Sequence, residues 1–121
     1  MNKWLILLIG GGLGTVLRFA VSVWANRQME HSFPYGTLIV NLSGCLLIGM
    51  LAGWESANEL HENTKLLLFV GLMGGFTTFS SFSLETLQLL RSGAIGSAVI
   101  YVLVSTLGGL LLAAGGFKLT S

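Results

Sequence analysis

The residues of this chain that could do chemistry are a few polar side chains set within long apolar segments. Thr37 and Asn41 lie four positions apart, so they share one face of a helix. Ser97, Tyr101 and Ser105 follow one another at the same spacing near the C-terminal end. Their hydroxyl and amide groups donate hydrogen bonds. Within a bilayer, each group must find a partner or line an aqueous path.

A third set of polar side chains is concentrated over residues 74–85, with the sequence GGFTTFSSFSLE. Paired Gly followed by paired Thr forms helices weakly, so we predict a break in a helix near Gly74 to Phe79. Such a break at membrane depth occurs only where the backbone is buried in protein or lines water. Freed carbonyls can then coordinate a small cation. An unbroken helix, with its Ser and Thr hydroxyls bonded to preceding carbonyls, stays open as the alternative.

These donors favour a small anion over a large organic solute. They are the amide of Asn41 and the hydroxyls of Thr37, Ser81, Tyr101 and Ser105. Phe79 and Phe82 lie three apart, and the edges of their rings carry positive quadrupole character. Ring edges could face an anion without holding it too tightly to leave. Ordinary packing of both rings in lipid or in the protein core is the alternative.

Two charged residues interrupt the apolar segments. Arg18 could extend toward the membrane interface, or it could raise the anion concentration at a pore mouth. Glu85 lies one turn after Ser81, and its carboxylate would repel an anion. We therefore expect Glu85 to organise a row of hydroxyls. A proton-coupled transport site at Glu85 is the alternative, because intramembrane carboxylates often serve that purpose.

Membrane helices must position these side chains. The 121 residues include only six Lys or Arg and five Asp or Glu, and this 9% charged fraction compares with roughly 25% in soluble domains. A bilayer core needs about 20 helical residues. Four segments meet this need, at roughly residues 4–24, 35–54, 66–90 and 92–117. The sequence thus predicts one all-α domain over residues 1–121, with four transmembrane helices and the third broken mid-membrane. The first apolar run is too long for a removable leader, so we expect a retained helix.

Composition argues against several other classes of protein. A net charge of +1 cannot supply a phosphate-neutralising face, so we expect no nucleic-acid partner. One Cys and two scattered His form no Cys/His metal site. The pattern also contains no activated nucleophile, so we expect neither an enzyme nor an organic cofactor.

The basic residues are almost evenly divided between the two sides of the membrane. One side would hold Lys3, Lys65 and Lys118, and the other Arg27 and Arg91, with Arg18 embedded nearby. A Lys/Arg excess normally sets orientation, so this near-balance predicts dual topology. An antiparallel homodimer is then the natural closed assembly. Orientation imposed by one strong helix is the alternative.

Four segments resemble those of the Fluc, or CrcB, family of fluoride channels. They are residues 10–14 with Arg18 and Phe19, residues 36–41 with Gly44, residues 74–85, and Tyr101 with Ser105. The resemblance implies dual-topology antiparallel dimers with two fluoride pathways. Each pathway would be lined by Asn41, Phe79 and Phe82, with a polar track formed by or close to Thr37, Ser81, Glu85, Tyr101 and Ser105. Arg18 would lie near an aqueous vestibule. The carbonyls of Gly74 and Thr77 would hold a structural Na⁺ at the dimer interface.

The role implied by this resemblance is passive export of cytoplasmic fluoride across the bacterial inner membrane, which confers fluoride resistance. A small proton-coupled multidrug exporter is the main alternative. Such exporters carry a Glu in the first helix, whereas this chain carries Arg18 there and places Glu85 in the third. A noncatalytic membrane assembly subunit is a second alternative, and it predicts no ion flux from the purified protein.

Overall fold

Each of the four apolar stretches becomes a long helical run in the computed structural model, which describes residues 2–121. The first two runs are α1 (Lys3–Gln28) and α2 (Tyr35–Ala57). The third run consists of α3 (Glu62–Lys65), η1 (Leu66–Met73), α4 (Gly74–Phe76) and α5 (Phe79–Arg91). The fourth comprises α6 (Ile95–Leu103), η2 (Val104–Gly108) and α7 (Gly109–Thr120), and both η segments are wider π-helical turns. All four runs are long and apolar enough to cross a membrane, as predicted.

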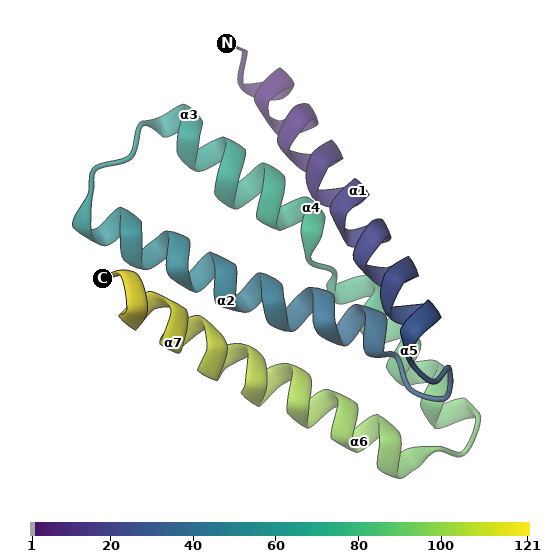
Figure 1. The fold of residues 1–121 in the computed structure, drawn as a ribbon. Coiled ribbons are helices and arrows are strands. Elements are labelled where there is room, and N and C mark those ends of the chain that lie inside the picture. Colours follow the sequence, from purple (N-terminus) through teal and green to yellow (C-terminus); the bar gives the residue numbers. More distant parts are fainter. Residues whose placement is uncertain (1) are drawn as a thin grey trace.

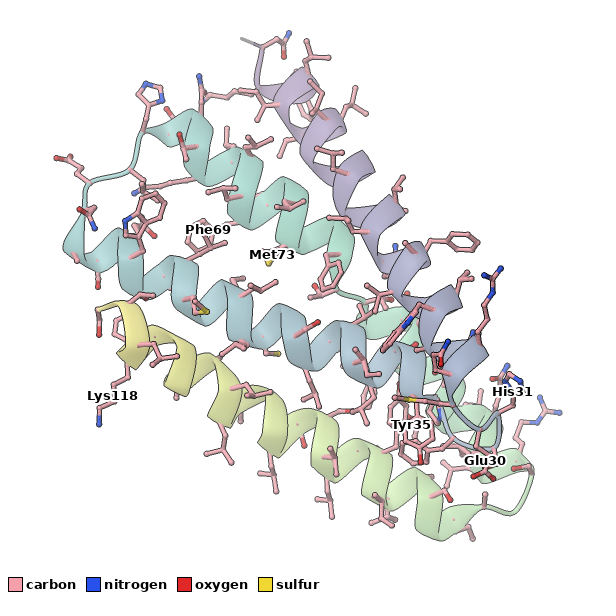
Figure 2. The ribbon with its side chains drawn as sticks, viewed as in Figure 1. Glu30, His31, Tyr35, Phe69, Met73 and Lys118 are labelled. Carbon is pink, nitrogen blue, oxygen red and sulfur yellow. The ribbon has the colours of Figure 1, made fainter. Side chains whose placement is uncertain are left out.

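Successive runs alternate in direction, and α2 lies in the middle (Figure 1). On one side α1 packs along η1 and α4, and on the other side α7 packs along α2. Both termini lie at the end that carries the connection between α2 and α3 (Figure 1). Lys118 is at this end, whereas Glu30 and His31 are at the opposite end (Figure 2). Lys118 therefore lies at the end where the sequence predicts it, away from residues 30 and 31.

The helices extend further than the charge-free segments predicted. The first continues to Gln28, the second to Ala57, and the third begins at Glu62. Two ion pairs explain why charged residues are tolerated at one end, Lys3 Nζ to Glu62 Oε1 at 2.7 Å and Lys65 Nζ to Glu55 Oε1 at 2.5 Å. Helices can continue into the membrane interface, where such side chains remain hydrated.

The fourth helix begins later than predicted because the turn before it is longer. Gly93 adopts a positive φ of 85°, which glycine tolerates without strain. Its N–H donates to the carbonyl of Leu90, and the N–H of Ala94 donates to the carbonyl of Leu89. This pair of bonds is the Schellman ending of a helix.

Small residues at helical spacing bring the helix backbones together. A Cβ atom on Gly14 would lie 2.7 Å from the Phe76 nitrogen and 3.0 Å from the Gly75 carbonyl carbon. A Cβ atom on Gly49 would lie 2.8 Å from Cα of Ala113 in α7. Small residues at these positions therefore allow the close backbone contacts that membrane helices favour. Val40, Met73 and Phe76 form a small buried core beside the Gly14 contact.

Replacing Gly14 with Ala is expected to destabilise the bundle, because the added methyl group would overlap the backbone of α4. Overpacking of this kind costs about 1–3 kcal/mol. Gly12→Ala is the matched control, since a Cβ atom there meets nothing within 4 Å. Thermal unfolding of both purified variants in detergent checks the prediction. Equal melting temperatures would contradict the prediction, because they would show that α1 and α4 can move apart without loss of stability.

Candidate functional site

The third helical run is interrupted at Thr77 and Thr78, inside the segment where the sequence predicts a break. Thr77 has φ −86° and ψ 158°, and Thr78 has φ −150° and ψ 117°, so both are extended. The side chain of Asn41 on α2 replaces the missing helical bonds. Its Nδ2 donates to the Thr78 carbonyl at 2.8 Å, and its Oδ1 accepts from the Thr78 N–H at 2.8 Å.

These bonds take the helical donors away from the carbonyls of Gly74 and Thr77. The N–H of Thr78 donates to Asn41, so the carbonyl of Gly74, four residues earlier, loses that donor. The N–H of Ser81 donates to Oγ1 of Thr78 at 3.1 Å, so the carbonyl of Thr77 loses its donor as well. Thr78 thereby caps the N-terminus of α5.

Arg18 also contacts the interrupted segment. Its Nε donates to the carbonyl of Gly75 at 3.0 Å, across the contact between α1 and α4. The side chain is half-buried. The inner nitrogen of Arg18 is therefore held by the backbone of another helix.

Glu85 accepts hydrogen bonds from hydroxyl groups on two neighbouring helices. Thr37 Oγ1 donates to Oε1 at 2.5 Å, and Tyr101 OH donates to Oε2 at 3.5 Å. Tyr101 is completely buried. Glu85 thus organises hydroxyl groups, as expected, although the partner from α2 is Thr37 and none of the described bonds joins Glu85 to Ser81. The Thr37 hydroxyl hydrogen is consequently not available to an anion in this arrangement.

One cavity beside the break is lined by both Phe79 and Phe82. This cavity, called the Phe cavity below, has a volume of about 360 Å³. Its lining residues are Asn41, Gly44, Cys45, Ile48, Thr77, Thr78, Phe79, Phe82, Ser105 and Thr106. The ring centroid of Phe82 lies 5.7 Å from that of Phe79 and 5.1 Å from that of Tyr101. Oγ of Ser105 is buried and has no hydrogen-bond partner within residues 2–121.

Two further cavities are lined by other predicted polar residues, namely Arg18, Thr37, Ser81 and Glu85. The Arg cavity, of about 170 Å³, is lined by Thr15, Arg18, Phe19, Ser22, Thr37, Val40, Thr78 and Ser81. A larger recess of about 470 Å³ opens at the end that carries residues 29–34, and Glu85 lies in its wall with Asn26, His31, Gln88 and Ser92. Thr78 lines both the Phe cavity and the Arg cavity, so the break separates the two.

This sequence and its site have recognisable relatives. A family model described as CrcB-like protein, Camphor Resistance (CrcB), matches residues 5–117. The chain belongs to the CrcB-like family. A relative from Parabacteroides distasonis is 48% identical over 92% of this chain and 87% of its own length. Relatives from Thermus thermophilus and Methylobacillus flagellatus are 41% and 45% identical, each over 98% of this chain and 94% of their own lengths. All three are named "Fluoride-specific ion channel FluC".

The structure of this CrcB-like chain divides the predicted site residues into groups. Asn41, Phe79, Phe82 and Ser105 meet at the Phe cavity, whereas Arg18, Thr37 and Ser81 meet at the Arg cavity. Tyr101 and Glu85 connect the two groups. The ring of Tyr101 packs against Phe82, the Glu85 carboxylate accepts from Thr37, and Tyr101 donates to Glu85.

Sequence reasoning did not single out Thr78 or Gly44 as residues that build the site. Thr78 uses its N–H, its carbonyl and its hydroxyl within the break. Gly44 leaves room for the side chain of Thr77, which a Cβ atom would overlap. The paired Thr was visible in the sequence, but only the structure shows which member of the pair bonds to Asn41.

Proposed function

We propose that this integral membrane protein is a fluoride-selective passive channel that exports cytoplasmic fluoride across the bacterial inner membrane. The Phe cavity carries the proposal, because it combines the rings of Phe79 and Phe82, an unpartnered Ser105 hydroxyl and the Asn41 amide in a chain whose relatives are named fluoride channels. Such a protein is a channel and not an enzyme.

The cavity offers weak donors in place of a fixed charge. One N–H of the Asn41 amide is bonded to Thr78, and the other has no partner within residues 2–121. The Ser105 hydroxyl is similarly free to donate. Several weak donors let a small anion shed part of its hydration without being trapped, which conduction requires. A membrane potential that is negative inside then drives the anion outward, at about 2.3 kcal/mol per charge per 100 mV.

Two copies in opposite orientations would complete the channel. The near-balance of basic residues between the two ends supports dual topology. Phe79 is 79% exposed and Gly74 is also exposed, so the surface next to the break is open to a second chain. In this assembly the interruption at Thr77 and Thr78 would lie near the middle of the bilayer, with one pathway in each half of the dimer.

A structural Na⁺ at the dimer interface fits the residues that are present. The carbonyls of Gly74 and Thr77 have lost their helical donors, and carbonyls at a broken helix are suitable ligands for Na⁺. The Thr77 hydroxyl is bonded to the Met73 carbonyl at 2.9 Å, so this residue would use its backbone oxygen. The ion would supply positive charge that holds the two copies together at these oxygens.

The alternative of a proton-coupled multidrug exporter is not favoured. The first helix, α1, has no Asp or Glu, and its one charge distant from the helix ends, Arg18, is bonded to Gly75. Both carboxylate oxygens of Glu85 accept hydrogen bonds from hydroxyl groups, those of Thr37 and Tyr101.

Fluoride efflux from liposomes that contain the purified protein tests the proposed function. A fluoride electrode should record rapid efflux, and a chloride electrode should record none above that of protein-free liposomes. Absence of fluoride efflux from folded, dimeric protein would overturn the proposal. Resistance of cells to quaternary ammonium compounds is the corresponding test of the exporter.

A further inference from the structure

The carbonyl groups at the end of α4 have different partners. Gly74 and Thr77 have lost their helical donors, as described above, whereas Gly75 accepts a hydrogen bond from Nε of Arg18 at 3.0 Å. One oxygen is therefore capped by a side chain from another helix, between two that are free to bind an ion.

We propose that Arg18 is a positioning residue for the sodium site. By capping the carbonyl of Gly75, it holds the end of α4 in the orientation that leaves the carbonyls of Gly74 and Thr77 free for the cation. This inference rests on the proposed function, since it concerns the Na⁺ described there. It assigns to Arg18 a role in cation binding that is distinct from attracting anions at a vestibule.

The packing around Arg18 makes this cap rigid. Gly14 lies one helical turn before Arg18, and its missing side chain allows the backbone of α1 to contact Gly75 and Phe76. A Cβ atom on Gly75 would overlap the carbonyl oxygen of Gly11. The two backbones thus touch at the same place that the Arg18 side chain bridges. Movement of the Gly75 carbonyl away from Arg18 would break this hydrogen bond, and movement of α4 toward α1 is blocked by the contact of the two backbones.

Loss of the cap would affect the cation more than the fold. An uncapped Gly75 carbonyl would seek another donor or compete as a ligand, and either change would turn the adjacent peptide groups. Carbonyls bind small cations through their direction and number, so turning them weakens binding. A hydrogen bond from a charged donor contributes about 1.5–3 kcal/mol, and its loss corresponds to about a tenfold to hundredfold change in affinity.

Three substitutions separate the hydrogen bond from the charge. Nε2 of glutamine and Nε of arginine are the same number of bonds from Cα, so Arg18→Gln keeps a donor at this position and removes the charge. Arg18→Lys keeps the charge but places a methylene group at this position. Arg27→Gln is the matched control, because Arg27 is an exposed residue in the last turn of the same helix.

Binding of radioactive sodium to each purified protein, in buffer of constant ionic strength made with N-methylglucamine chloride, is the test. We expect Arg18→Gln and Arg27→Gln to bind sodium within about threefold of the original protein. We expect Arg18→Lys to bind it about tenfold or more weakly while remaining dimeric. The increase in melting temperature that sodium causes should follow the same order among the variants, since a bound ion stabilises the folded state.

Three results would overturn this inference. If Arg18→Lys binds sodium as well as the original protein, or if Arg18→Gln binds it as weakly as Arg18→Lys, the Nε hydrogen bond does not position the site. If the original protein itself binds no sodium, both the sodium site and the role of Arg18 are wrong. Fluoride efflux from the original protein, measured alongside, then shows whether the channel proposal survives by itself.

Discussion

Replacing Phe82 with Ile is expected to lower fluoride efflux by about tenfold or more while leaving the protein folded. Phe82 lies between Phe79 and Tyr101 and lines the Phe cavity. Isoleucine retains much of the bulk but lacks the ring edge, whose positive character would stabilise an anion as it passes. Loss of about 1.4 kcal/mol from the barrier region corresponds to a tenfold slower rate. The initial rate of efflux from liposomes, normalised to the amount of reconstituted dimer, measures the effect.

Phe79→Ile is expected to act in the same direction, because Phe79 lines the same cavity. Phe117→Ile is the control, since Phe117 is a partly exposed residue of α7 that lines none of the cavities described above. Full flux in both Phe79→Ile and Phe82→Ile would exclude the ring edges from conduction. The two rings would then serve only to pack the bundle.

Much of the architecture follows from patterns within single segments of the sequence. Apolar runs long enough to cross a bilayer predict all four helices, and the Gly-Gly and Thr-Thr pairs predict the break at Thr77 and Thr78. These features are local, because backbone propensity and helix length depend on neighbouring residues. The helix ends were predicted less well, since ion pairs such as Lys3 with Glu62 join residues that are far apart in the chain.

The partners of the polar side chains could not be predicted in the same way. Thr37 and Asn41 do share a face of α2, but Thr37 bonds to Glu85 and Asn41 bonds to Thr78. Each choice depends on how closely α2 approaches the third helical run, and the contact of Gly44 on α2 with Thr77 and Phe76 limits that approach. Two donors that the sequence offers to an anion are bonded within the protein instead, the Asn41 amide to Thr78 and the Thr37 hydroxyl to Glu85. Fewer donors are therefore available to an anion than the sequence suggests. The hydroxyl of Ser105 is one that remains without a partner within residues 2–121.

Because Asn41 bonds to the break, replacing it is expected to affect both the fold and the fluoride efflux. Asn41 satisfies both backbone groups of Thr78 and also lines the Phe cavity. Replacing it with Leu would leave a donor and an acceptor unpaired away from water, at about 1–3 kcal/mol for each. We expect Asn41→Leu to lose fluoride efflux and to melt at a lower temperature. Asn41→Asp should also lose efflux, because a carboxylate still accepts from the Thr78 N–H but cannot donate to the carbonyl, and its charge would repel an anion in the Phe cavity.

Ser43→Ala provides the matched control for this prediction. Ser43 lies on the same helix, but its hydroxyl donates only to carbonyls of that helix, Ile39 at 2.6 Å and Val40 at 3.0 Å. Its removal should therefore leave the melting temperature and the efflux rate close to those of the original protein. The two measurements on Asn41→Leu then distinguish its two roles. Loss of efflux at an unchanged melting temperature would mean that Asn41 serves the anion alone. Loss of both, with Ser43→Ala unaffected, would mean that the same amide maintains the break on which the pathway depends.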